Sequence, residues 1–95
     1  LLTQTGLNNN GTLNISGINS MGALEQYGDD NIGSVVVTGD NSIGRLSQNG
    51  NSNDTSLTVT GANADVTVTQ TGNNLVTAPS VVTNGGTVII NQSTP

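Results

Sequence analysis

Residues 21–42 read MGALEQYGDDNIGSVVVTGDNS, and residues 43–64 read IGRLSQNGNSNDTSLTVTGANA. Aligned without a gap, the two stretches share one plan: an alternating segment, a turn containing Gly and Asn, a second alternating segment and a second such turn. The plan continues on both sides of these stretches. We therefore treat the chain as a single repeat domain over residues 1–95, with units at 1–20, 21–42, 43–64 and 65–86 and a partial fifth unit at 87–95.

Glutamine marks the period most clearly, because all five glutamines of the chain are spaced 22 residues apart. Random placement would give this agreement with a probability on the order of a few in a million, so the repeat is real. Asparagine and glycine follow the same period. The columns are Gln4, Gln26, Gln48, Gln70 and Gln92; Asn9, Asn31 and Asn53; Gly6, Gly28, Gly50 and Gly72; and Gly17, Gly39 and Gly61.

Apolar residues form three further columns, and these predict the core. Within each alternating segment, successive side chains of a strand point to opposite faces. The alternation places the apolar columns inside together with the glutamines and Asn31, and it places Glu25, Tyr27 and Ser34 outside. The predicted core columns are Leu2, Leu24, Leu46, Val68 and Ile90; Leu13, Val35 and Leu57; and Ile15, Val37, Val59 and Val81.

Two short strands in each repeat, joined by tight turns, predict an all-β fold. We expect a β-solenoid of about four 22-residue strand–turn–strand repeats, in which two parallel sheets stack as an amyloid-like cross-β structure. Each repeat would add a rung about 4.8 Å above the last. Buried amides in one column can bond to each other from rung to rung, which removes the cost of burying them. Gly and Asn suit the turns because both tolerate positive φ.

The composition excludes several classes of protein. Only 32% of the residues are hydrophobic and Tyr27 is the sole aromatic, so a conventional globular core is not expected. A net charge of −5 with Arg45 as the single cation argues against nucleic acid as a partner. No apolar run approaches the roughly 20 residues of a membrane span, so we expect no membrane insertion.

The recurring motif resembles the repeat of curlin, the subunit of bacterial curli fibres. Its pattern, Ser-x5-Gln-x-Gly-x2-Asn, is matched over residues 20–31 and 42–53, with shorter matches at 4–9 and 64–72. The family's second glutamine is replaced by Ile15, Val37 and Val59, which makes the second strand more apolar.

This resemblance implies a structural subunit of an extracellular functional amyloid that self-assembles into a homopolymeric fibril. It further implies a secreted, cell-surface fibre in a biofilm matrix with a role in adhesion, a nucleator subunit and an outer-membrane secretion pore as partners, and targeting segments that are absent from this chain. The alternative is a monomeric β-solenoid binding module of adhesin or ice-binding type, although its outward Thr columns would be irregular.

We expect no enzyme activity, catalytic residue, metal site or cofactor. The carboxylates are dispersed, and the chain has no His or Cys. They are Glu25, Asp29, Asp30, Asp40, Asp54 and Asp65. The fourth unit departs from the pattern and is interpreted as an irregular joint or a partial cap. It has Leu75 in the Asn column, Pro79 in a strand, and Thr83 and Gly85 in the turn.

Overall fold

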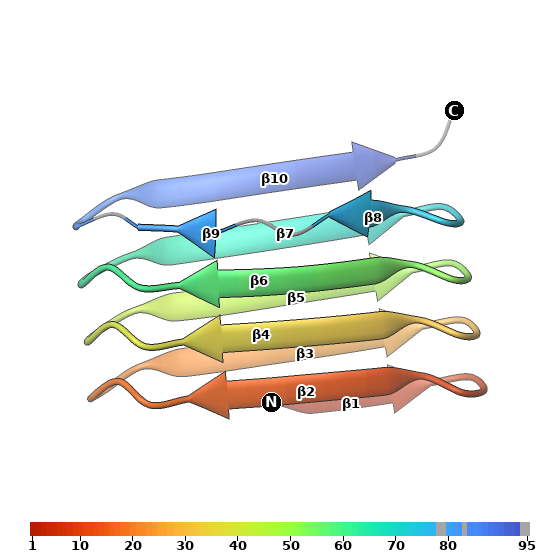
Figure 1. Cartoon of the computed structure of the whole chain (residues 1–95), viewed down its shortest axis with the longest axis horizontal. Coiled ribbons are helices and arrows are strands. Elements are labelled where there is room, and N and C mark those ends of the chain that lie inside the picture. Colours follow the sequence, from red (N-terminus) through yellow and green to blue (C-terminus); the bar gives the residue numbers. More distant parts are fainter. Residues whose placement is uncertain (78–79, 83, 94–95) are drawn as a thin grey trace.

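The computed structural model describes residues 1–77, 80–82 and 84–93. These residues form ten strands and two layers (Figure 1). The strands are β1 (Leu2–Thr5), β2 (Asn10–Ile15), β3 (Met21–Tyr27), β4 (Ile32–Val37), β5 (Ile43–Asn49), β6 (Asp54–Val59), β7 (Asp65–Thr71), β8 (Val76–Thr77), β9 (Ser80–Val81) and β10 (Thr87–Ser93). In this part of the chain there is no helix, and so none that could cross a membrane.

The strands alternate between two parallel sheets. One sheet has the order β1-β3-β5-β7-β10, and the other has the order β2-β4-β6-β8, with β9 also pairing with β6. Every pair is parallel and offset by 22 residues, as in Leu24↔Leu46 and Val35↔Leu57. The chain therefore winds as a β-solenoid of about four turns, which confirms the predicted fold class.

The first turn of each rung uses positive φ as predicted. Its glycines have φ between 116° and 130°, a region that disfavours side chains, and a second residue such as Asp30 has φ 60°. The second turn differs. Here the positive φ belongs to Asn19, Asn41 and Asn63, whereas Gly17, Gly39 and Gly61 have none. The predicted reason for this second glycine column was therefore wrong, and its role lies in packing.

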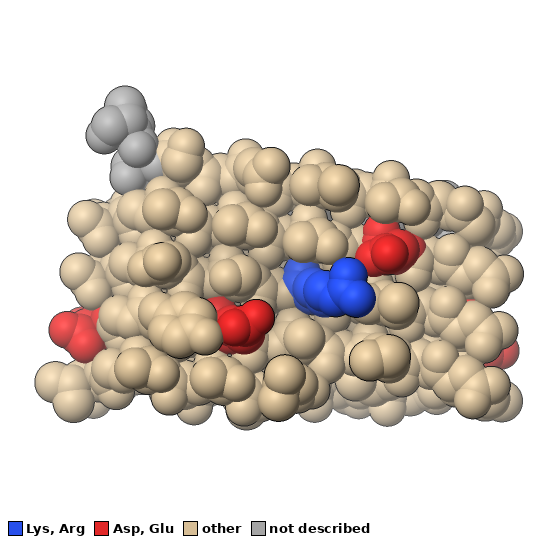
Figure 2. All heavy atoms as spheres, turned by 180° about the vertical axis from the view of Figure 1, so that it is seen from behind, with Lys and Arg blue, Asp and Glu red and all other residues tan. Residues whose placement is uncertain are grey.

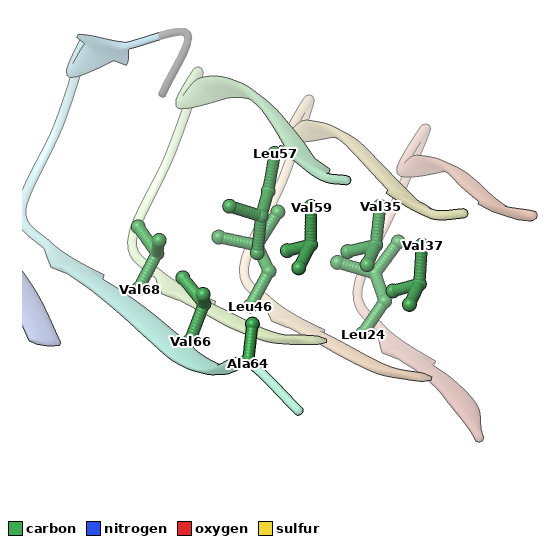
Figure 3. Packing of buried hydrophobic residues seen from close by; sticks show 9 residues of the cluster. All are labelled: Leu24, Val35, Val37, Leu46, Leu57, Val59, Ala64, Val66 and Val68. Atoms are coloured by element: carbon green, nitrogen blue, oxygen red, sulfur yellow. The ribbon is translucent and has the colours of Figure 1, made fainter. Parts of the chain in front are cut away.

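The core lies between the sheets and consists of small aliphatic side chains (Figure 3). Nine hydrophobic side chains are at most 1% exposed: Leu24, Val35, Val37, Leu46, Leu57, Val59, Ala64, Val66 and Val68. The sheets can lie this close because Gly22, Gly33 and Gly44 occupy inward positions. A Cβ at Gly22 would come within 2.7 Å of the side chain of Leu13, and one at Gly44 within 2.8 Å of Val37.

Burial of the predicted core columns falls off toward the two ends of the stack. Leu2 is 44% and Ile15 is 36% exposed, because both lie on the first rung and have a neighbouring rung on one side only. Leu13 and Ile90 are partly buried. The side chain of Val81 lies outside the described part of the structure, as do Pro79 and Thr83. Gly85 is described. It occupies the position of Asn19, Asn41 and Asn63 in earlier repeats, and its φ of 76° is positive like theirs.

Candidate functional site: the side-chain ladders

The five glutamines form one continuous ladder along the stack. Each Nε2 donates to the Oε1 of the glutamine on the next rung, over 2.7 Å from Gln4 to Gln26, 2.8 Å from Gln26 to Gln48, 3.0 Å from Gln48 to Gln70, and 2.8 Å from Gln70 to Gln92. The three central side chains are fully buried, while Gln4 is exposed and Gln92 is half-buried. All bonds run in the same direction, so the ladder is polar.

Additional contacts satisfy the remaining atoms of the buried glutamines. Nε2 of Gln26 also donates to the carbonyl of Asn10 at 3.2 Å, and Nε2 of Gln48 donates to the carbonyl of Ile32 at 2.9 Å. The hydroxyl of Thr55 donates to Oε1 of Gln70. In the described residues no buried side-chain polar atom lacks a partner, so the amide column avoids the penalty for burying an unpaired group.

The asparagine column is built differently from the amide-to-amide ladder that the sequence predicts. Oδ1 of Asn31 accepts from the backbone N–H of Asn53 at 3.0 Å, and its Nδ2 donates to the carbonyl of Gly50 at 2.8 Å. Asn9 and Asn53 make the equivalent pair of bonds to the rung that follows each of them. Each asparagine therefore holds the backbone of the next turn instead of the next amide.

The turn glycines allow neighbouring rungs to come into backbone contact. A Cβ at Gly39 would overlap the carbonyl oxygen of Gly61, and one at Gly28 would overlap that of Gly50. Equivalent overlaps occur at Gly6, Gly17 and Gly50. The two glycine columns thus allow the turns at both edges of the solenoid to stack at the spacing that strand pairing sets.

The comparison with known families decides what kind of repeat this is. Residues 39–72 match the family model of the curlin-associated repeat. This segment is a curlin-associated repeat. No curated protein matches the chain. Within the matched segment lie β5, β6 and β7 together with Gln48 and Gln70, which are two of the three fully buried glutamines of the ladder. The curlin repeat and the solenoid fold are structural rather than enzymatic and point to a subunit of the curli type.

A column of serines, which was not predicted to be part of the site, also connects the rungs. Oγ of Ser42 donates to the carbonyl of Gly61 at 2.6 Å and accepts from the N–H of Ala64 at 3.2 Å. Ser20 makes the same two contacts one rung below. At the second turn, serine therefore bonds to the backbone of the next rung, as asparagine does at the first turn. The signal was present in the sequence, because serine opens the recurring motif.

Two outer columns contain carboxylates that the sequence suggested were only solvated charges. Oδ1 of Asp29 accepts from the backbone N–H of Leu7 at 3.0 Å, and Oδ1 of Asp40 accepts from that of Ile18 at 2.9 Å. Asn51, Asn73 and Asn84 accept in the same way on later rungs. Although they are exposed, these side chains hydrogen-bond their turns to the rung below.

The remaining charges lie mainly on the outer face of β3, β5 and β7. There the guanidinium of Arg45 lies 3.7 Å from the carboxylate of Asp65, and Figure 2 shows the blue cation beside a red carboxylate. On the same face the Tyr27 hydroxyl donates to Oε2 of Glu25 at 2.9 Å. The described residues contain no group of three or more His, Cys, Asp or Glu side chains that could hold a metal ion.

Proposed function

We propose that this chain is a structural subunit of an extracellular functional amyloid fibre, which lengthens by end-to-end stacking of its solenoids. The observation that best supports this proposal is the glutamine ladder. It is buried, its hydrogen bonds all run in one direction, and it lies within parallel strands in 22-residue register. Because the ladder columns repeat from rung to rung, an end rung can pair with a rung of a second copy in the same way as it pairs with its neighbour in the same chain.

The edge strands support this proposal. β1 and β10 bound one sheet, and β2 bounds the other. Half of the backbone N–H and C=O groups of a parallel edge strand point away from its single neighbour, so such an edge recruits further strands. On the first rung, Leu2 and Ile15 are partly exposed although their columns are buried further along the stack. A second copy stacked there would cover these side chains and gain apolar burial in addition to the backbone bonds.

The biological setting follows from the likeness to curli subunits and belongs to the same proposal. The fibre is secreted and displayed at the cell surface, where it contributes to a biofilm matrix and to adhesion. Its principal partner is a second copy of itself, and a nucleator subunit and an outer-membrane secretion pore serve its assembly and export. Neither nucleic acid nor membrane insertion has a part in this function.

The test is conversion of the purified soluble chain into fibres. We expect thioflavin-positive fibres whose diffraction shows a meridional repeat near about 4.8 Å, with each subunit adding about 20 Å of length. Preformed fibre fragments should abolish the lag phase, because they supply the open edge. A chain that stays monomeric and β-rich for days at high concentration, with or without such fragments, would contradict the proposal and favour a monomeric binding module.

A further inference from the structure

The two outer faces of the solenoid differ in charge and relief. The β3–β5–β7 face presents Glu25, Arg45 and Asp65, together with the projecting side chains of Met21 and Tyr27. The β2–β4–β6 face presents short and mostly uncharged side chains. Its outward residues on these strands are Asn10, Thr12, Asn14, Ile32, Ser34, Val36, Asp54, Ser56 and Thr58.

The middle of the β2–β4–β6 face is a column of short hydroxyl side chains. Thr12, Ser34 and Ser56 lie above one another at its centre, because β2, β4 and β6 pair in register. Asp54 is the single charge on this face and lies at the start of its strand, away from that central column. Two copies that meet through this face therefore have one charged side chain each to bring together and desolvate, whereas the opposite face has Glu25, Arg45 and Asp65.

We infer that the β2–β4–β6 face is a lateral docking surface for the same face of a second, parallel filament. This inference rests on the proposed fibre function. A two-fold axis along the fibre reverses the strand direction of the second copy, so the start of one strand faces the end of the other. With the Thr12, Ser34 and Ser56 columns facing each other, Asp54 then lies opposite the Asn14, Val36 and Thr58 column, and the two Asp54 side chains lie on opposite margins of the contact. Short hydroxyl side chains can interdigitate in such a contact as a steric zipper.

The size of the face predicts when pairing occurs. Strands of six residues stacked over about four rungs present roughly 400 Å² per copy, from about 3.3 Å per residue and about 4.8 Å per rung. A stable pair of proteins buries about 800 Å² on each partner, so two single solenoids do not hold together through this face. In a filament the same contact repeats with every subunit. Lateral pairing thus follows elongation and depends on filament length.

The experiment compares two double variants of equal charge. Ser34→Lys with Ser56→Lys places two cations at the centre of the β2–β4–β6 face, whereas Ser47→Lys with Thr69→Lys places two on neighbouring rungs of the opposite face. Fibre width is measured by electron microscopy, and elongation is followed from seeds of each variant's own fibres. We expect the two variants to elongate at similar rates, because each places two like charges on neighbouring rungs, but the first should show a modal width about half that of the parent, since one of two packed filaments is lost.

The matched control should keep the parental width, and about 0.5 M salt should restore pairing in the first variant by screening the added charges. Ser56→Lys alone provides a milder form of the same test and should give an intermediate share of single filaments. Equal widths for the two double variants, or parental fibres that never pair, would overturn the inference and leave the fibre function standing. If the parent forms no fibres at all, both proposals fail. The first variant could instead keep the parental width and lose binding to a polysaccharide-coated surface. That outcome would overturn the inference and indicate that the face binds carbohydrate.

Discussion

The buried glutamine Gln48 shows how a polar residue can serve as a core residue. Its side chain is fully buried, yet it accepts from Gln26 and donates to Gln70 and to the carbonyl of Ile32. A buried amide is tolerated only when its partners are supplied by the structure. Here the partners are copies of itself one rung away, so repetition removes the penalty.

Replacing this amide should weaken both the subunit and its assembly. Gln48→Leu takes one of two partners from Nε2 of Gln26 and one from Oε1 of Gln70, each of which keeps its second contact. We expect a loss of about 1–3 kcal/mol in unfolding free energy and slower fibre growth. Ser47→Ala alters an outward side chain on the same strand and should change stability by less than about 0.5 kcal/mol. Urea denaturation and thioflavin kinetics measure both effects, and equal behaviour of the two variants would contradict the inward placement of the ladder.

Tyr27 offers a spectroscopic probe of the outer face, because the chain has no other aromatic residue. The hydrogen bond to Glu25, and then the negative charge of that carboxylate, raise the pKa of Tyr27 above its ordinary value of 10.0. The folded chain therefore holds this proton more firmly than the unfolded chain does. The stabilisation is fully present below about pH 10 and is lost as the pH rises through the raised pKa.

Removing the carboxylate should return the tyrosine toward its ordinary titration. Glu25→Gln replaces the charged acceptor by a neutral amide, so the pKa of Tyr27 should fall, as measured by the ultraviolet absorbance of the phenolate. Asp65→Asn removes a carboxylate from the same face without touching the bond to Tyr27 and should leave the titration unchanged. A Tyr27 titration that is the same in both variants would show that Glu25 is not its partner.

At the scale of strands and turns, the rungs are held together by contacts between their turns as well as by the pairing of their strands. Asn9, Asn31 and Asn53 connect the first turns of three rungs to the rung above, and Ser20 and Ser42 do the same for the second turns of two rungs. Glycine allows the backbones to meet at both places. The turns thus transmit the register from one rung to the next.

Two glycine substitutions separate steric from conformational demands. Gly39→Ala would drive a methyl group into the carbonyl of Gly61, although Gly39 does not have positive φ, and should cost about 2–3 kcal/mol by overpacking. Gly85→Ala meets nothing within 4 Å but must adopt a φ of 76°, at a cost of about 1 kcal/mol. Chemical denaturation of both variants should rank Gly39→Ala as the more destabilising. The reverse order would mean that conformation, and not rung contact, selects this glycine.

At the scale of the whole molecule, charge is diluted along the stack. The register places Glu25 between Thr3 and Ser47, and Asp65 between Ile43 and Thr87, so neither carboxylate has another carboxylate directly above or below it. Two like charges about 4.8 Å apart would repel by roughly 1 kcal/mol in water. A polymer of solenoids would repeat that cost in every subunit.

Ser47 variants test this arrangement. Ser47→Glu places a second carboxylate next to Glu25, so fibre growth at neutral pH and low salt should be slower and should recover at high salt. Ser47→Lys gives Glu25 a partner of opposite charge and should assemble at least as fast as the parent. Growth rates followed by thioflavin fluorescence measure the difference. If the two variants grow equally fast at low salt, residues 25 and 47 are not rung neighbours in the fibre.

The sequence by itself determined the rung register, the faces and the fold class. These features repeat every two or every 22 residues, so identical positions such as Gln26 and Gln48 must stack once the chain winds as a solenoid. Burial of Leu24, Val35 and Gln26 follows from the same alternation.

Only the tertiary structure decided which atoms meet between turns. Asn31 bonds to a backbone carbonyl instead of another amide, Gly39 is required for rung contact and not for its φ, and Asp29 fastens a backbone N–H. The physical reason is that a column fixes which residues are neighbours, whereas the backbone path of each turn fixes the direction in which their donors and acceptors point.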